Sequence, residues 1–327
     1  MKLLAVIINY KTPEMTLSAV AALLRELGAY PDARVAVVDN ASNDGSLDKL
    51  RKGIVDAGWS GQVEILASPW NGGFAWGNNF AIRPALEARD LPEYVYLLNS
   101  DAFPDVGSIE RLVEYLDAHP DTGIAGSYIH GTDGKTHKTA FRFPSIASEF
   151  EATLGIGVVS RLLQDRIVSP ELPTTTTRVG WLAGASMLIR REVFDAVGVM
   201  DDGYFLYYEE TDFCLRAARA GWPTVYVVES SVSHIGSVST GFQDISKPTP
   251  SYWYASRRRY FLKNHGRATL WAANLVYIVG GMIRRLRYWL IGRASHEPRR
   301  HMRDFLRFNL RLGPPPNVHP PRPEERP

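Results

Sequence analysis

Short apolar runs alternate with longer amphipathic segments along the first part of the chain. Four of these runs are rich in Val, Ile, Leu and Tyr and have the length of buried β-strands: Leu3–Ile8, Arg34–Val38, Val63–Leu66 and Tyr94–Leu98. Apolar residues at helical spacing predict a helix after each strand: one from Thr12-Pro13, one from Asp44 or Ser46, one through Phe80–Ala88 and one over Val106–His119. Strands that alternate with helices predict an α/β fold with a mostly parallel central sheet and helices on both faces.

The pattern is less regular in the second half of the chain. Residues 130–178 include polar, Gly- and Thr-rich stretches, and we expect an insertion or a mobile loop region there rather than a separate domain. Regular structure is expected again in four segments: Trp181–Ile189, a helix from Arg191, an acidic helix over Glu209–Ala220 and a strand over Thr224–Val228. The Pro-rich tail, residues 313–327, is expected to be extended or disordered.

Polar residues follow each of the first four predicted strands at the point where the strand ends. They are Asn9-Tyr10, Asp39-Asn40, Asn71-Gly72-Gly73 and Asn99-Ser100-Asp101. Any one of these groups is typical of an ordinary turn. Open α/β sheets bind ligands outside the carboxyl ends of their strands, so four such groups at one edge predict a ligand site.

The turn after the first strand excludes two common kinds of nucleotide site. It has the sequence NYKTPEMT, without the G-x-G-x-x-G that a dinucleotide-binding protein carries there, and the complete P-loop pattern G-x-x-x-x-G-K-[ST] does not occur in the chain. Asp39 nevertheless follows the second strand, where nucleotide-binding α/β proteins place an acid that contacts a ribose or a base. The sheet is therefore expected to bind a nucleotide, but in neither of these two ways.

Two acids at the start of the acidic helix are candidates for acid–base chemistry. Glu209 and Glu210 lie in its first turn, where the helix dipole favours acids, so capping alone would explain them. Aromatic residues beside them suit a sugar ring. We expect the dipole and surrounding water to keep one carboxylate ionised, as a general base requires. Asp212 and Arg216 are expected to form a structural pair at i,i+4.

Asp101 and His234 are candidates for holding a metal ion. One carboxylate and one imidazole, completed by nucleotide phosphates and water, suit Mg²⁺ or Mn²⁺. A single His is more often a hydrogen-bonded structural residue, so this prediction depends on the two side chains lying close together.

Composition and charge divide the chain into two regions. Of its 327 residues 45 % are hydrophobic and 22 % charged, which is typical of a globular protein. Between Arg257 and Arg311 the charge is +12, whereas residues 1–256 carry −10. The single cysteine, Cys214, favours a reducing compartment. The N-terminal apolar run is too short for a signal peptide and lacks a cleavage site, so we expect a cytoplasmic protein.

The basic C-terminal region suits a membrane surface better than a membrane span. Its apolar stretch Leu270–Ile283 has roughly 14 residues, and a helix needs about 20 to cross a bilayer. Trp and Tyr beside Arg clusters instead favour helices that lie in the interface. The alternative is that these helices pack on the body of the protein or on another subunit, so an oligomer is also possible. Nucleic acid is disfavoured, because the acidic body would repel it and no motif for it is present.

Seven stretches within residues 3–240 carry a family resemblance. In order they are VIINYKTP, VVDNASNDGS, NGGFAWGNN, LLNSDA, WLAGASMLIRR, YYEETDFCLRAARAGW and HIGSVS. Together they resemble the inverting family 2 glycosyltransferases of GT-A fold, especially the bacterial rhamnosyltransferase-like branch. The resemblance implies a GT-A nucleotide-diphospho-sugar transferase domain over residues 1–256, with a nucleotide-binding half at about 1–128 and an acceptor half at about 129–256. A basic helical segment, residues 257–312, would follow.

The resemblance also implies a donor site. The triplet NSD stands in the place of the family's D-x-D, so Asp101 would hold the metal under the donor diphosphate, and His234 matches a metal-binding His of part of the family. Asn99 replaces the first acid and supplies no charge. Residues at the other strand ends would contact the nucleotide sugar: Asn9, Asp39, Asn40, Asn71 and Gly73.

For catalysis the resemblance points to Glu210. It matches the second acid of the family's Glu-Asp pair, which is usually the catalytic base, and Glu209 remains a rival because Glu is one methylene longer than Asp. Trp181 matches an aromatic residue that often lines the acceptor pocket. The implied reaction is a single displacement, in which the deprotonated acceptor hydroxyl attacks the anomeric carbon and inverts it.

The resemblance makes dTDP-L-rhamnose the first donor to test, with a UDP-sugar as the alternative. It implies a polyprenyl-linked saccharide or a growing cell-wall polysaccharide as acceptor, at the inner face of the cell membrane. Two other functions stay open. A nucleotidyltransferase should carry a Gly-rich basic loop where this chain has NYKTPEMT. A catalytically silent sugar- or lipid-binding protein of the same fold is suggested by the departures at Asn99 and Glu210.

Overall fold

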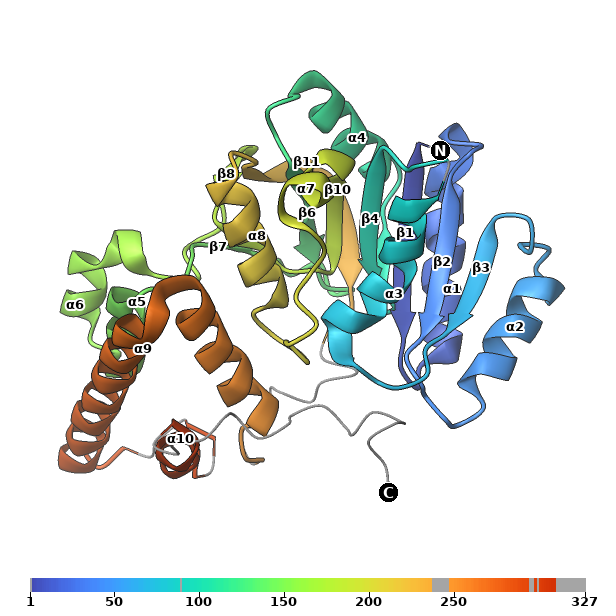
Figure 1. The fold of residues 1–327 in the computed structure, drawn as a ribbon. Coiled ribbons are helices and arrows are strands. Elements are labelled where there is room, and N and C mark those ends of the chain that lie inside the picture. Colours follow the sequence, from blue (N-terminus) through green and yellow to red (C-terminus); the bar gives the residue numbers. More distant parts are fainter. Residues whose placement is uncertain (1, 89, 237–246, 294–296, 299, 310–327) are drawn as a thin grey trace.

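The computed structural model describes residues 2–88, 90–236, 247–293, 297–298 and 300–309, and its main feature is one central sheet (Figure 1). In spatial order its strands are β3 (Val63–Ala67), β2 (Arg34–Asp39), β1 (Leu3–Asn9), β4 (Tyr94–Asn99), β10 (Ser186–Arg190), β6 (Ile124–His130), β11 (Thr224–His234) and β5 (Ala102–Pro104), and β8 (Thr177–Val179) pairs with β11. The four strands expected in the first part of the chain are confirmed, each one residue longer than predicted.

The first four strands are parallel, and their register places the polar strand ends side by side. Asn9 of β1 lies opposite Asp39 of β2, and Ile8 lies opposite Asn99 of β4. The apolar side chains of these strands therefore form the core, while the residues just beyond them share one edge of the sheet. This is the edge at which a ligand site was expected.

The second part of the sheet is mixed. β10 is antiparallel to β4 and β6, whereas β11 is parallel to β6 and antiparallel to β5. β11 continues to His234, past the expected end at Val228, because its register shifts before Ser231 and it then pairs with β5. His234 lies opposite Ala102, the residue after Asp101. The long last strand thus brings His234 to Asp101.

Helices cover both faces of the sheet, as the alternation of strands and helices predicted. Leu3, Ala5 and Ile7 of β1 pack on one face under α1 (Pro13–Glu26), α2 (Ser46–Asp56) and α4 (Ser108–Ala118). Leu4 and Val6 pack on the other face under α3 (Gly73–Glu87), α7 (Arg191–Val197) and α8 (Glu209–Arg219). A short 3-10 helix, η1 (Leu27–Ala29), follows α1. α3 begins at Gly73, ahead of the expected Phe80.

Residues 130–178, expected to be an insertion or a mobile loop region, contain more helix than that expectation implied. This segment contains β7 (Ala140–Phe141), α5 (Ile146–Leu154), α6 (Gly157–Leu162), η2 (Gln164–Arg166) and β8. Ser145 and Ser148 form a reciprocal capping box at the start of α5. β7 pairs with β9 (Trp181–Leu182) in a separate two-stranded sheet, so the stretch expected to be continuous over Trp181–Ile189 divides between β9 and β10.

The C-terminal region is helical and lies beside the sheet domain (Figure 1). It consists of α9 (Ser251–Leu290) and α10 (His301–Asn309). α9 bends at Gly266, where φ is 83° and ψ is 174°, and we call residues 251–265 its first arm and residues 267–290 its second arm. The first arm begins ahead of residue 257 and contacts α8, whereas the second arm packs on α5. In the described ranges no helix has the length and apolarity that a membrane span requires.

A buried arginine holds the C-terminal region together. Arg257 is 1 % exposed, and its Nε and Nη2 donate to Glu149 Oε2 of α5 at 3.0 and 2.8 Å. Its Nη1 donates to Asn274 Oδ1 of the second arm at 2.7 Å. The guanidinium carbon also lies 5.0 Å from the ring centre of Tyr277 and 5.1 Å from that of Phe305 in α10. One side chain therefore connects α5, both arms of α9 and α10.

Candidate active site

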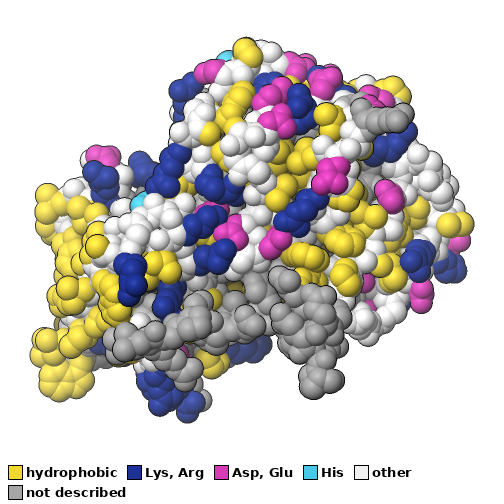
Figure 2. Space-filling view, in the orientation of Figure 1, with side chains coloured by type: hydrophobic (Ala, Val, Ile, Leu, Met, Phe, Trp, Pro, Cys, Tyr) yellow, Lys and Arg dark blue, Asp and Glu magenta, His cyan; other side chains and the backbone are white. Residues whose placement is uncertain are grey.

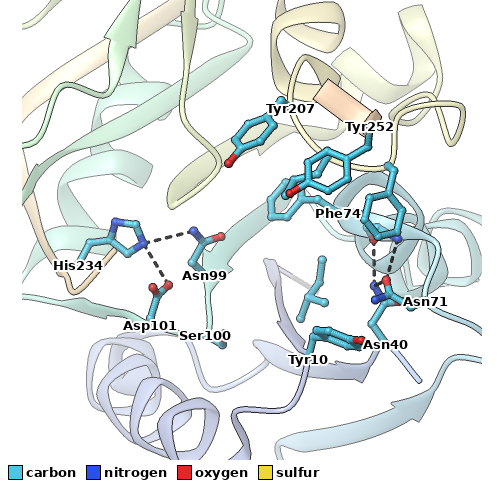
Figure 3. Close-up of a pocket in the computed structure, with 14 residues that line it drawn as sticks. Tyr10, Asn40, Asn71, Phe74, Asn99, Ser100, Asp101, Tyr207, His234 and Tyr252 are labelled. Carbon is cyan, nitrogen blue, oxygen red and sulfur yellow. Dashed lines mark hydrogen bonds and ion pairs between the residues drawn. The ribbon is translucent and has the colours of Figure 1, made fainter. Parts of the chain in front are cut away.

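A pocket of about 480 Å³ opens at the carboxyl edge of the parallel strands (Figure 3). Six of the residues expected to form the donor or metal site line it: Asn40, Asn71, Gly73, Asn99, Asp101 and His234. They come from the ends of four strands and from the start of α3. The topology therefore assembles most of the expected site from residues that are far apart in the sequence.

Asp101, His234 and Asn99 form a polar cluster at one end of the pocket (Figure 3). His234 Nε2 lies 3.0 Å from Asp101 Oδ1 and 3.4 Å from Asn99 Nδ2. Within the described part of the chain, no three His, Cys, Asp or Glu side chains are grouped as metal ligands. The pair Asp101 and His234 could give a divalent ion one oxygen and one nitrogen, and the donor set is chemically suitable for Mg²⁺ or Mn²⁺ if other ligands complete it.

Asn9 and Asp39 lie behind the pocket wall and not on it. Asn9 Nδ2 donates to Asp39 Oδ1 at 2.7 Å, and the Ser42 hydroxyl donates to the same oxygen at 2.6 Å. The Ser42 backbone N–H donates to Asp39 Oδ2 at 3.2 Å, so both carboxylate oxygens stabilise the turn after β2. The next residue, Asn40, lines the pocket, and its Nδ2 donates to Asn71 Oδ1 at 3.1 Å and to the Gly73 carbonyl at 3.0 Å.

Gly73 permits a close approach of two loops. Its φ is +85°, and a Cβ added there would lie 1.8 Å from the Phe205 carbonyl oxygen. The backbone N–H of Phe74 donates to that same oxygen at 2.9 Å. Any side chain at position 73 would separate the two loops, so Gly73 brings residues 205–207 to the pocket.

Aromatic side chains form much of the remaining wall. Tyr207 and Tyr252 lie on one side of the pocket and Tyr10 on the other, and Phe74 and Phe205 also line it (Figure 3). Phe205 and Tyr207 belong to the aromatic residues before the acidic helix that were expected to suit a sugar ring. Tyr10 belongs to the first of the four polar strand ends, whereas Phe74 and Tyr252 were not expected to line the site. No local signal indicates Tyr252, because it reaches the pocket through the docking of α9.

The backbone is strained where the aromatic wall meets the acidic helix. Tyr207 and Tyr208 have φ values of 68° and 70°, in the left-handed region that residues with bulky side chains rarely adopt. Such strain costs on the order of 1–3 kcal/mol per residue and is concentrated at functional sites. Here it turns the chain from the pocket wall into the first turn of α8, which carries Glu209 and Glu210.

Glu210 lies next to the pocket wall, and Glu209 is more deeply buried. Glu210 Oε1 accepts a hydrogen bond from the Gly184 N–H at 3.0 Å. A Cβ added at Gly184 would lie 2.9 Å from Glu210 Oε1 and 2.7 Å from the ring of Phe74, which lines the pocket. Glu209 is 1 % exposed, and within the described residues its Oε2 has no hydrogen-bond partner.

Burial shifts the pKa of both acids in the same direction. Burial raises the pKa of Glu210. Burial, together with the nearby charge of Glu210, raises the pKa of Glu209 well above its usual value. Desolvation outweighs the hydrogen bonds that favour the charged form of Glu210, so burial opposes the ionised state that was expected of one of these carboxylates. A buried glutamate with a raised pKa is a stronger base once it is ionised.

Trp181 lies apart from the pocket lining. Its Nε1 donates to the Arg142 carbonyl at 3.0 Å, and its ring stacks on Phe141 with centres 4.3 Å apart. The side chain also packs against the hydrophobic core on the α8 face of the sheet. Cys214 is buried in the same core.

The fold is shared with solved structures of glycosyltransferases. A solved structure of similar fold is the mannosyltransferase PcManGT from Pyrobaculum calidifontis in complex with GDP-Man and Mn²⁺, which is 14 % identical and gives a TM-score of 0.57 over 90 % of this chain and 76 % of that chain. The sheet, the helices on both faces and the strand-edge pocket are those of a GT-A glycosyltransferase.

The family can be stated more closely. The model of Glycosyl transferase family 2 matches residues 4–198, and the chain belongs to this family. An N-acetylglucosaminyl-diphospho-decaprenol L-rhamnosyltransferase of Mycobacterium tuberculosis is 32 % identical over 63 % of this chain and 68 % of its own length. The dTDP-rhamnosyl transferase RfbF of Shigella flexneri is 27 % identical over 80 % of both chains. The protein is thus a hexosyltransferase-type glycosyltransferase that resembles rhamnosyltransferases.

Proposed function

We propose that this glycosyltransferase transfers L-rhamnose from dTDP-L-rhamnose to a hydroxyl of a lipid-linked or polysaccharide acceptor, with inversion of the anomeric carbon. The observation that carries the proposal is the Asp101–His234 pair in a pocket that also contains Asn40 and Gly73. The names of two relatives support the sugar: one is a dTDP-rhamnosyl transferase and the other an L-rhamnosyltransferase acting on a decaprenol-linked saccharide. A UDP-sugar is the alternative donor.

We assign the donor to the nucleotide-binding half, residues 1–128, with His234 added from β11. Asp101 and His234 would hold Mg²⁺ or Mn²⁺, which supplies positive charge to the departing diphosphate when it is bound. Asn99 provides an uncharged amide beside them. The amide of Asn40 and the backbone at Gly73 border the other end of the pocket and would orient the nucleotide sugar. Asn9 and Asp39 support this wall by holding the turn that positions Asn40.

Glu210 is the proposed general base. It does not line the pocket, but its Oε1 and the ring of Phe74, which does, both lie beside Gly184, and the ionised carboxylate would take a proton from an acceptor hydroxyl. Burial raises its pKa, which increases its basicity, and the Gly184 N–H fixes one carboxylate oxygen. Attack from the side opposite the nucleotide would invert the anomeric carbon. Glu209 is a less suitable base, because it is more deeply buried and its pKa is raised further.

We assign the acceptor to residues 129–256, which include Tyr252, whose ring lines the pocket opposite Tyr10 (Figure 3). Aromatic rings pack against the apolar faces of sugars, and Tyr207 and Tyr252 lie 6.1 Å apart between ring centres. Trp181, which lies apart from the pocket lining, would contact a part of the acceptor outside the pocket. A cytoplasmic location is proposed from the single buried thiol, Cys214.

The test separates binding from turnover. Thermal shift with dTDP, UDP and their sugars, with and without Mn²⁺, identifies the donor, since a ligand of the folded state raises Tm. Asp101→Ala should abolish the part of the Tm increase that depends on Mn²⁺. The control Asp121→Ala, which removes a carboxylate from a surface ion pair, should keep it. Transfer from dTDP-L-rhamnose to a polyprenyl-diphospho-saccharide then measures activity.

Glu210→Gln distinguishes an enzyme from a silent binding protein. General-base catalysis contributes about 10²–10⁴ in rate, so this substitution should reduce transfer by that factor and leave donor binding intact. Binding of a nucleotide sugar without transfer to any acceptor, in the original chain and in the variant alike, would refute the catalytic assignment. An increase in Tm with UDP-sugars alone would mean that the donor is a UDP-sugar, and the proposed mechanism would stay the same.

A further inference from the structure

A stripe of large apolar side chains covers the outward side of the second arm of α9. Eight of them are at least 41 % exposed: Trp271, Leu275, Val279, Met282, Ile283, Leu286, Trp289 and Leu290. Their spacing of three and four places them on one side of the helix, while Ala273 and Gly280 on the other side are buried. We call these eight residues the apolar stripe.

The stripe reverses the usual arrangement of a helix at the surface of a protein. Such a helix normally buries its apolar side and exposes its polar side. The neighbouring helix α6 adds Val158 and Leu162, which are 66 % and 79 % exposed. Figure 2 shows hydrophobic atoms, in yellow, gathered along one edge of the molecule over these elements. A contiguous exposed patch of this kind marks a contact surface.

Positive charge borders the stripe. At 100° per residue, Arg267 and Arg285 fall on one flank of the stripe and Arg287 on the other. Between residues 267 and 309 the sequence has nine Arg and two acids. Both acids, Glu297 and Asp304, already form ion pairs with arginines. The surroundings of the stripe are therefore positively charged.

We infer that the apolar stripe docks on an anionic lipid surface, with the second arm lying in the plane of the membrane interface. An apolar side bordered by arginines, with a tryptophan near each end, is the pattern of interfacial helices. At 1.5 Å per residue the second arm extends about 35 Å, so all eight side chains can enter one flat surface. A second copy would bring the same arginines against each other, which opposes pairing of two stripes.

The second arm is held in place, so the stripe cannot turn inward to be buried. Asn274 accepts a hydrogen bond from the buried Arg257, and Arg287 donates to the Gly155 carbonyl beside α6 at 2.8 Å. Gly280 lies so close to α5 that an added Cβ would be 2.4 Å from Thr153 Oγ1. Rotation of the arm would break these contacts. The stripe is thus a fixed feature of the surface.

Flotation with phospholipid vesicles tests the inference on the full chain. The protein should float with vesicles that contain phosphatidylglycerol, more weakly at high salt, and much less with phosphatidylcholine alone. Leu275→Glu and Leu286→Glu should each reduce the partition coefficient by at least about tenfold. Arg267→Gln should reduce it about fivefold. The matched control Val55→Glu introduces the same charge at an apolar position of α2 that is 67 % exposed and should change nothing.

Three results would overturn the inference. The original chain could stay with the lipid-free fraction, or Val55→Glu could reduce flotation as much as Leu275→Glu. Light scattering could instead show a dimer that Leu275→Glu converts to monomer without any vesicle binding, which would make the stripe an interface between copies. Circular dichroism checks the fold, and Leu286→Gln replaces any variant that unfolds. Flotation needs neither donor nor acceptor, so its outcome is independent of the proposed transfer reaction.

Discussion

Asp212 joins the acidic helix to the C-terminal region, and we predict that this connection is a major source of stability. The side chain is fully buried in α8. It accepts hydrogen bonds from four side chains: Tyr204 Oη (3.2 Å), Arg216 Nε (2.9 Å), Lys263 Nζ (2.8 Å) and Asn264 Nδ2 (2.7 Å). The expected i,i+4 pair with Arg216 is confirmed, and two of the four donors come from the end of the first arm of α9. Asp212→Asn keeps the shape but removes the charge.

The size of the effect follows from these contacts. Hydrogen bonds to a charged group contribute about 1.5–3 kcal/mol each, and the substitution weakens two such bonds to cations. Part of this stabilisation is retained, because Lys263 still pairs with Asp201 and Arg216 still donates to the Val199 carbonyl. We therefore expect the free energy of unfolding to fall by about 3–4 kcal/mol. For 327 residues the entropy of unfolding is about 0.7 kcal/mol/K, so Tm should fall by about 5 °C.

Calorimetry and urea unfolding of Asp212→Asn measure this loss. The control is Asp195→Asn, the same chemical change at a side chain that is 57 % exposed and pairs with Arg191 at i,i+4. A surface pair contributes less than about 1 kcal/mol, so the control should remain close to the original stability. Equal losses in the two variants would refute the reasoning, since they would mean that burial of the Asp212 network adds nothing.

Three further predictions concern protons and backbone. Burial raises the pKa of Glu210, so the acid limb of the kcat–pH profile should lie above pH 4.5, and a limb at or below this value would exclude Glu210 as the base. Burial lowers the pKa of His301 from 6.5 to about 4, so the unfolded chain takes up this proton first as the pH falls. The contribution of His301 to the free energy of unfolding should be fully present above about pH 6.5 and should decrease by about 3 kcal/mol toward pH 4. Urea unfolding of His301→Gln at several pH values should lack this decrease. Gly73→Ala should weaken nucleotide binding at least about tenfold in calorimetric titrations, because its Cβ would meet the Phe205 carbonyl oxygen, whereas Gly28→Ala, which has open space around it, should bind normally.

The sequence predicts the donor half of the fold better than the rest, for a physical reason. In β1 to β4 the residues on both faces of each strand are apolar and enter two cores, so these short continuous apolar runs are readily recognised as buried strands of a parallel sheet. The polar residues after the strands must then share one edge, so the neighbourhood of Asn40, Asn99 and Asp101 can be inferred without a structure. The transfer of a sugar was inferred from the resemblance to family 2 glycosyltransferases.

The sequence indicates Asp101 and His234 as a pair, but it does not reveal the register shift in β11 that brings them together. Tyr252 reaches the pocket through the docking of α9 on α8, which has no local signal in the sequence. Residues 130–178 lack a clear period because their helices are short, and α5 packs on the distant helix α9. The raised pKa of Glu210 depends on its burial, which position in a helix does not reveal.

The range of residues that line the pocket has a consequence for how the protein is made. The wall is built from Ile8 at one end of the chain to Tyr252 near the other, with Asp101 and His234 between them. A chain emerging from the ribosome can form the β1–β2 pair early, but the pocket cannot close until α9 has been synthesised. An incomplete chain that ends before residue 252 would contain every residue assigned to the donor but would lack Tyr252, so the aromatic wall is completed only when α9 is present.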